Sequence, residues 1–81
     1  MTQEEIFACI LEQVRDVEPD LADRELGPTD SLRKLGLDSM QRVEILMLSM
    51  EALEIEVPRD ELNSPQNLGE LAALFHQKKA G

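Results

Sequence analysis

Aromatic side chains are almost absent from this 81-residue sequence, which contains Phe7 and Phe75 but no tryptophan or tyrosine. Hydrophobic residues nevertheless make up 42% of the chain, so the core must consist of aliphatic side chains and methionine. Such a core favours packed helices over a sheet, whose strands are enriched in aromatic residues. We therefore expect an all-α fold in one small domain spanning residues 1–81, because the chain is too short for two cores.

Long apolar runs are also missing. No stretch approaches the roughly 20 consecutive apolar residues of a membrane-spanning helix, and residues 1–5 lack the basic and apolar regions of a signal peptide. The single cysteine, Cys9, cannot form an internal disulfide and is expected to pack as a small apolar residue. These absences predict a cytoplasmic protein that does not act in a membrane.

Positive charge is scarce, since 8 lysines and arginines face 17 acidic residues and the net charge is -9. The negative electrostatic potential of such a protein repels phosphate groups. This disfavours nucleic acids and anionic membranes as partners and favours basic proteins. An acidic cluster lies at the end of the first predicted helix, but it is interrupted by Pro19 and lacks the central glycine of a calcium-binding loop. We predict a solvated acidic turn and no metal site at these residues: Asp16, Glu18, Asp20 and Asp23.

Histidine occurs once, as His76 near the C-terminal end. A nucleophilic serine needs a base within hydrogen-bond reach, whereas His76 is expected to be a partly exposed residue near the end of a helix. We therefore predict no catalytic residues and no enzymatic activity.

Helical periodicity predicts a small four-helix bundle with three main helices and one short helix. The first helix covers residues 2–17, where Thr2 and Glu5 have the spacing of a capping box. A short helix is expected over residues 59–62, and Ser64 is expected to cap a final helix with Pro65 at its first position. A second long helix runs from Ser39 or Met40 to Leu53 or Glu54, with an expected inward stripe of Val43, Leu46, Met50 and Leu53.

A long connection, residues 18–38, separates the first and second helices. A loop of this length in a compact domain needs a reason. We expect its leucines to anchor it across the helices: Leu21, Leu26, Leu32, Leu35 and Leu37.

The segment Gly36-Leu37-Asp38-Ser39-Met40 places a serine hydroxyl where the loop ends and the apolar second helix begins. Either Asp38 or Ser39 can act as the N-cap, and the unpaired amides of the first helical turn favour a nearby anion. Taken alone, Ser39 could be a helix cap and nothing more.

The sequence Leu35-Gly36-Leu37-Asp38-Ser39-Met40, continued by Gln41-Arg42-Val43-Glu44-Ile45-Leu46, resembles the attachment site of acyl carrier proteins. Nearly the whole chain shares the length, acidity and helix order of that family. The resemblance implies that Ser39 is esterified with 4'-phosphopantetheine from coenzyme A, whose thiol bears acyl groups as thioesters. It also implies a separate phosphopantetheinyl transferase, which brings coenzyme A and magnesium, with Asp38 helping at that metal during modification.

Further partners follow from the same resemblance: an acyl-loading or ligase enzyme, and a ketosynthase or another thioester-processing enzyme, all acting on a monomeric carrier. In this family the second helix is the docking surface, which assigns partner recognition to Met40, Glu44 and Met47. Core packing is the alternative for both methionines, and an ordinary solvated face is the alternative for Glu44.

Two features of the second helix depart from carriers of the fatty-acid type. Gln41 and Arg42 replace acidic or small polar residues, which makes the motif more similar to carriers of polyketide or polyunsaturated-acid synthases. Ser49 stands where such helices usually bury an aliphatic residue, so either the helix is rotated slightly or a hydrophobic surface faces a dedicated partner.

Two other functions remain open beside that of an acyl carrier. One is an aminoacyl or peptidyl carrier, including a D-alanyl carrier, and the other is a non-carrier helical adaptor.

Overall fold

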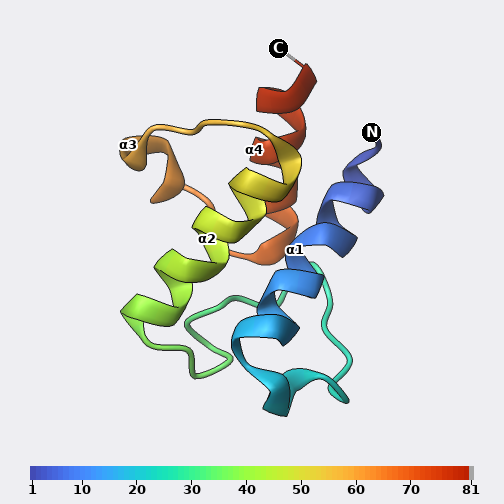
Figure 1. Cartoon of the computed structure of the whole chain (residues 1–81), viewed down its shortest axis with the longest axis vertical. Helices are drawn as coiled ribbons and strands as arrows, with labels where there is room; N and C mark the ends of the chain where they lie inside the picture. The colour runs from blue at the N-terminus through green and yellow to red at the C-terminus, as the bar shows by residue number, and fades with distance from the viewer. Residues whose placement is uncertain (81) are drawn as a thin grey trace.

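The computed structural model describes residues 1–80, which form four α-helices and one 3-10 turn and contain no β-strand. The elements follow in the order α1 (Gln3–Val17), η1 (Pro19–Leu21), α2 (Ser39–Leu53), α3 (Arg59–Leu62) and α4 (Leu68–Ala80). This arrangement confirms the predicted all-α bundle of three main helices and one short helix. Figure 1 shows α1 and α2 side by side, with α3 on the side of α2 that is remote from α1.

Helix α1 is the central packing element, because it contacts both α2 and α4. Its N-terminus is closed by the predicted capping box: Glu5 N donates to Thr2 Oγ1 at 3.1 Å, and Thr2 N donates to Glu5 Oε1 at 2.8 Å. The hydrogen bond from the Thr2 amide lowers the pKa of the Glu5 carboxyl below its usual value. Four side chains of α1 are buried in the core: Ile6, Ile10, Leu11 and Val14.

The connection from α1 to α2 crosses the bundle as the leucine pattern predicts. Leu21, Leu26 and Leu37 are buried, and Leu32 and Leu35 are half-buried against the core. Gly36 ends a tight turn with a φ of +87°, a conformation that favours glycine. Leu37 therefore enters the core immediately before α2 begins.

The buried side of α2 differs from the expected stripe. Ile45, Ser49 and Leu53 face the core, whereas Val43 is 51% exposed. The prediction for Val43 was wrong because α2 is apolar around most of its circumference, so packing against α1, and not periodicity, decides which side is buried. Ser49 is fully buried and its hydroxyl has no hydrogen-bond partner among residues 1–80.

Helix α4 begins at Leu68, so the predicted start at Ser64 and Pro65 was wrong. Asn67 Oδ1 accepts a hydrogen bond from Glu70 N at 2.8 Å, in place of a cap from Ser64. The first two amides of α4 bind the turn formed by residues 27–30: Leu68 N donates to Asp30 O at 2.8 Å, and Gly69 N donates to Pro28 O at 2.9 Å. These contacts join the long connection to α4.

This contact requires glycine at position 69. A Cβ there would lie 2.9 Å from Pro28 Cβ and 3.1 Å from the Pro28 carbonyl oxygen. We expect Gly69→Ala to lower the free energy of unfolding by about 1 kcal/mol or more in chemical denaturation, because overpacking outweighs the gain in helix propensity. The control is Gly27→Ala, whose Cβ would meet only Asp30 Oδ2 at 3.9 Å; equal stability of the two variants would contradict the close contact.

Candidate functional site

Ser39 is the first residue of α2, and its side chain is exposed. Asp38 is the N-cap, which decides between the two caps allowed by the sequence. Gln41 N donates to Asp38 Oδ1 at 2.8 Å, and Asp38 N donates to Gln41 Oε1 at 3.1 Å. Because Asp38 performs the capping, the Ser39 hydroxyl is not required for it.

Gln41 and Arg42 attach the start of α2 to the rest of the fold. Gln41 Nε2 donates to Glu18 Oε2 at 3.1 Å, and Arg42 Nη1 donates to the Leu37 carbonyl oxygen at 3.0 Å. The sequence showed these residues only as departures from a family pattern. The spacing of Asp38 and Gln41 is nevertheless that of a capping box, which could have revealed the role of Gln41.

The electrostatics at Ser39 favour an anion on its side chain. The amides of Ser39 and Met40 lie in the first turn and have no intrahelical acceptor, and the helix dipole places partial positive charge there. The Ser39 hydroxyl has no side-chain hydrogen-bond partner among the residues that the structure describes. His76, the single histidine, lies on α4 and not on the elements that surround Ser39.

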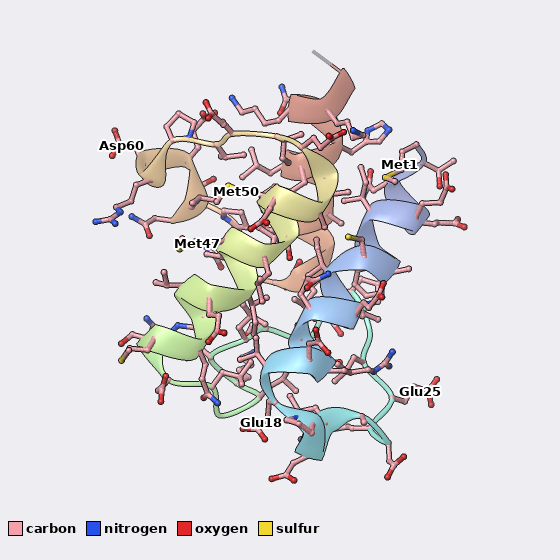
Figure 2. All side chains as sticks on the ribbon, viewed as in Figure 1. Met1, Glu18, Glu25, Met47, Met50 and Asp60 are labelled. Atoms are coloured by element: carbon pink, nitrogen blue, oxygen red, sulfur yellow. The ribbon has the colours of Figure 1, made fainter. Side chains whose placement is uncertain are left out.

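An exposed apolar surface extends along α2 from Ser39. Met40 is 81% exposed and Met47 61% exposed, and Val43 lies between them. Glu44 and Glu51 border the same shallow hollow, whose volume is about 460 Å³. Figure 2 shows Met47 on the side of α2 that faces away from α1, so core packing does not explain either methionine. We call Met40, Val43, Glu44 and Met47 the α2 face.

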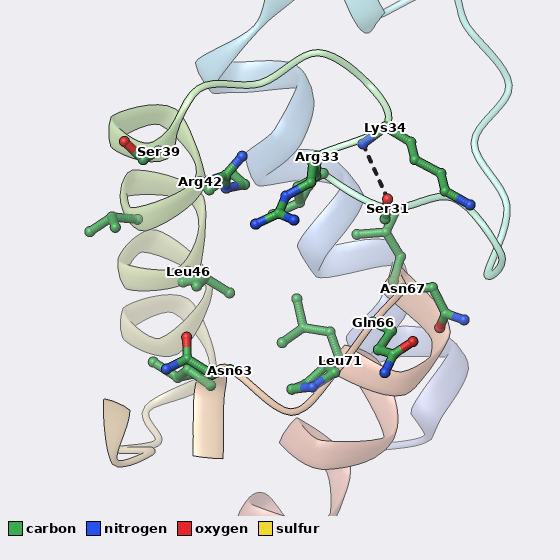
Figure 3. A pocket seen from close by; sticks show the side chains of 15 residues that line it. Ser31, Arg33, Lys34, Ser39, Arg42, Leu46, Asn63, Gln66, Asn67 and Leu71 are labelled. Carbon is green, nitrogen blue, oxygen red and sulfur yellow. Dashed lines mark hydrogen bonds between the residues drawn. The ribbon is translucent and has the colours of Figure 1, made fainter. Parts of the chain in front are cut away.

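A second hollow, of about 570 Å³, lies on another side of α2, and we call it the α2–α4 cleft. It is bounded by α2, the loop of residues 31–34 and the segment from the end of α3 into α4. Ser39 borders both this cleft and the α2 face. Figure 3 shows Arg42 projecting from α2 toward Arg33, with Leu71, Gln66 and Asn67 on the opposite wall.

The other residues singled out in the sequence do not form a site. Within residues 1–80, no group of three or more histidine, cysteine, aspartate or glutamate side chains is arranged to hold a metal ion. Of the acidic residues clustered at the end of α1, Asp16, Asp20 and Asp23 are exposed, and Glu18 is half-buried and bonded to Gln41. Cys9 is half-buried with a free thiol. None of the described helices is long and apolar enough to span a bilayer.

Comparison with known proteins adds independent information. Residues 9–75 match the family model described as a phosphopantetheine attachment site. The chain is 36% identical over 78 residues to the polyketide biosynthesis acyl-carrier-protein AcpK of Bacillus subtilis, covering 96% of this chain and 95% of that protein. It is 32% identical over 69 residues to an acyl carrier protein of Streptomyces coelicolor, covering 79% of this chain and 75% of that protein.

A solved structure is similar over nearly the same length. A chain from the crystal structure of the curacin biosynthetic pathway HMG synthase in complex with acetyl donor-ACP superposes with a TM-score of 0.90. The two chains are 47% identical, and the match covers 96% of this chain and 100% of that chain.

The link between α2 and Glu18 can be tested by Gln41→Ala. This change removes two hydrogen bonds of the Gln41 side chain, so we expect a loss of about 1–2 kcal/mol in the free energy of unfolding. The matched control is Gln77→Ala, since Gln77 is an exposed glutamine on α4. Unequal losses in chemical denaturation are expected, and identical losses would show that Gln41 does not stabilise the start of α2.

Proposed function

The chain belongs to the phosphopantetheine-attachment family of acyl carrier proteins, and we propose that Ser39 is the residue to which its 4'-phosphopantetheine is attached. The protein is a carrier and not an enzyme. The attached group supplies a thiol that bears acyl groups as thioesters. The single observation that supports Ser39 most directly is its exposed hydroxyl at the first position of α2, beside amides without intrahelical acceptors.

The residues around Ser39 suit this group. A phosphodiester at the N-terminus of α2 would be stabilised by the first-turn amides and the helix dipole. Asp38 keeps α2 from unwinding at this end, and its cap bond uses only Oδ1 in the contacts described above. We propose that the Asp38 carboxylate also helps to bind magnesium while the transferase modifies Ser39.

The pathway forms a further part of the proposal. The Bacillus relative is named as a polyketide biosynthesis carrier. The motif of this chain after Ser39, with Gln41 and Arg42, also resembles the motif of such carriers. We propose that this chain carries acyl intermediates in polyketide or related secondary-metabolite biosynthesis. Aminoacyl or peptidyl cargo remains the alternative, but the names of these relatives do not favour it. Membership of a carrier family leaves the non-carrier adaptor without support.

The proposed partners are a phosphopantetheinyl transferase, an acyl-loading or ligase enzyme, and a ketosynthase or other thioester-processing enzyme. We propose that they bind the α2 face, because exposed methionines adapt to different apolar surfaces and Glu44 attracts basic ones. The proposal includes a monomeric, cytoplasmic carrier in a single domain of residues 1–81. The net charge of -9 supports the exclusion of nucleic acids and anionic membranes as partners.

Attachment at Ser39 can be tested by intact-mass spectrometry after incubation with coenzyme A, magnesium and a broad-specificity transferase. The wild-type chain should gain one phosphopantetheine, and Ser39→Ala should gain none. Ser31→Ala is the control, since Ser31 also borders the α2–α4 cleft and should remain dispensable. Modification of Ser39→Ala, or no modification of the wild type, would contradict the assignment.

Docking on the α2 face can be tested by Glu44→Lys and Met40→Ala. Each should lower kcat/KM of the transferase for the apo-carrier by about 3- to 10-fold, since an interface contact of this kind contributes roughly 1 kcal/mol. Glu12→Lys reverses a charge on the exposed side of α1 and should leave the kinetics unchanged. Unaltered kinetics for both α2 variants, with an intact helical circular dichroism spectrum, would show that enzymes dock elsewhere.

A further inference from the structure

The α2–α4 cleft concentrates positive charge in an otherwise acidic protein. Arg33 and Lys34 border it from the loop, and Arg42 borders it from α2. These three are among only 8 lysines and arginines in a chain with 17 acidic residues. Within the described part of the chain, no aspartate or glutamate lines the cleft.

The three cations also lack acidic partners. Among residues 1–80, one ion pair is formed, between Lys78 Nζ and Glu61 Oε2 at 2.8 Å. Arg33, Lys34 and Arg42 form no ion pair within these residues. Arg42 is held in place by its bond to the Leu37 carbonyl oxygen, which does not neutralise its charge. Other basic residues also lack ion pairs, but Arg33, Lys34 and Arg42 border one cleft that no carboxylate lines. Such a cluster of positive charges attracts an anionic group.

The remaining walls show what kind of group the cleft can receive. Leu46 of α2 and Leu71 of α4 supply apolar surface, while Asn63, Gln66 and Asn67 supply side-chain amides. An acyl chain can place its methylene groups on the leucines. A carboxylate at the end of that chain can accept hydrogen bonds from the guanidinium groups in a bidentate geometry.

We propose that the α2–α4 cleft binds the terminal carboxylate of a carboxyacyl cargo, a dicarboxylic acid joined to the carrier through one of its two carboxyl groups. This inference rests on the proposed attachment at Ser39, which borders the cleft. The tether makes binding intramolecular, so weak contacts suffice to populate the bound state. The same weakness allows the cargo to leave for an enzyme.

The phosphodiester of the tether is a less suitable partner for these cations. It is bonded directly to Ser39, so it stays at the first turn of α2. Figure 3 shows Arg33 and Lys34 across the cleft from α2, with Arg42 between Ser39 and Arg33. A terminal carboxylate on a flexible arm can reach the far side of the cleft.

The test compares two cargoes of the same shape on the full-length carrier. A transferase loads one sample from glutaryl-coenzyme A, with ¹³C in the terminal carboxyl group, and another from 5-methylhexanoyl-coenzyme A, in which an isopropyl group replaces the carboxylate. Intact mass is measured first. The pKa of the labelled carboxyl group is then obtained by NMR titration, with glutaryl-pantetheine in the same buffer as reference.

The sign of the expected shift distinguishes the cleft from the rest of the surface. The average field of a protein with a net charge of -9 raises the pKa of a tethered carboxyl group, whereas binding by the cations lowers that pKa. We expect a pKa about 0.5 unit below the reference at low salt, an effect that 1 M salt largely removes. Backbone amides of residues 31–34 should shift with glutaryl cargo and not with 5-methylhexanoyl cargo.

Two double variants show which cations lower the pKa of the labelled carboxyl group. Arg33→Gln combined with Lys34→Gln should return the pKa to the reference or above it. Arg24→Gln combined with Arg59→Gln removes the same charge from exposed positions that do not line the cleft, and should keep the lowered pKa.

The other outcomes distinguish failure of attachment at Ser39 from failure of carboxylate binding in the cleft. Absence of loading in the mass spectrum would overturn attachment at Ser39 and this inference with it. Successful loading with a pKa at or above the reference would overturn the inference alone, and would leave the cations for an acidic surface on a partner enzyme. Equal amide shifts for both cargoes, or for the carrier with an unloaded arm, would show that the cleft responds to the arm and not to a carboxylate.

Discussion

The hydrogen bonds between Asp38 and Gln41 determine where α2 begins, and the functional surfaces are arranged from that point. Asp38 takes the capping position, so Ser39 enters the first turn with a free and exposed hydroxyl. On one side Leu37 is buried in the core, and on the other Gln41 binds Glu18 at the end of α1. A helix start held from both sides keeps Ser39 in one position, so the motion that a carrier needs would come from the arm proposed to be attached there.

Helix α2 then presents three different surfaces to three different surroundings. Ile45, Ser49 and Leu53 pack into the core. The α2 face exposes two methionines and Val43 beside Glu44, a combination that suits transient binding of basic enzymes. A third side carries Arg42 into the α2–α4 cleft. Because Ser39 borders both hollows, a group attached there can lie in the cleft or extend toward a bound enzyme.

The wall of the cleft near α3 is held by few contacts. No residue of α3 is buried, and the ion pair from Lys78 to Glu61 connects this short helix to α4. Lys79 Nζ donates to the Leu53 carbonyl oxygen at 2.8 Å, which joins α4 to the end of α2. A partly exposed ion pair contributes little to stability, and the other contact that holds α3 is the half-buried Leu62, which packs against the core.

Local sequence determined the features that depend on neighbours within one helical turn. These include the capping box of Thr2 and Glu5 and the placement of Ser39 at the start of a helix. The leucines of the long connection were recognisable as apolar residues in a polar loop, although the contacts that bury them are long-range. The family motif around Ser39 was recognisable for the same reason, because its residues are consecutive. The exposed position of Met40 and Met47 agrees with the role inferred for them, although periodicity could not separate it from core packing.

Contacts between distant segments decided the rest. Pro65 after Ser64 is a good local helix start, yet α4 begins at Leu68, where its first amides bind the carbonyl groups of Pro28 and Asp30. Helix α2 is apolar on most sides, so packing against α1 selected Ile45 and Ser49 for the core and left Val43 outside. The cationic cleft exists because the folded loop brings Arg33 and Lys34 opposite Arg42. Arg33 and Lys34 lie in a loop and Arg42 on α2, so no single helix or strand relates these positions and only the tertiary structure could bring their charges together.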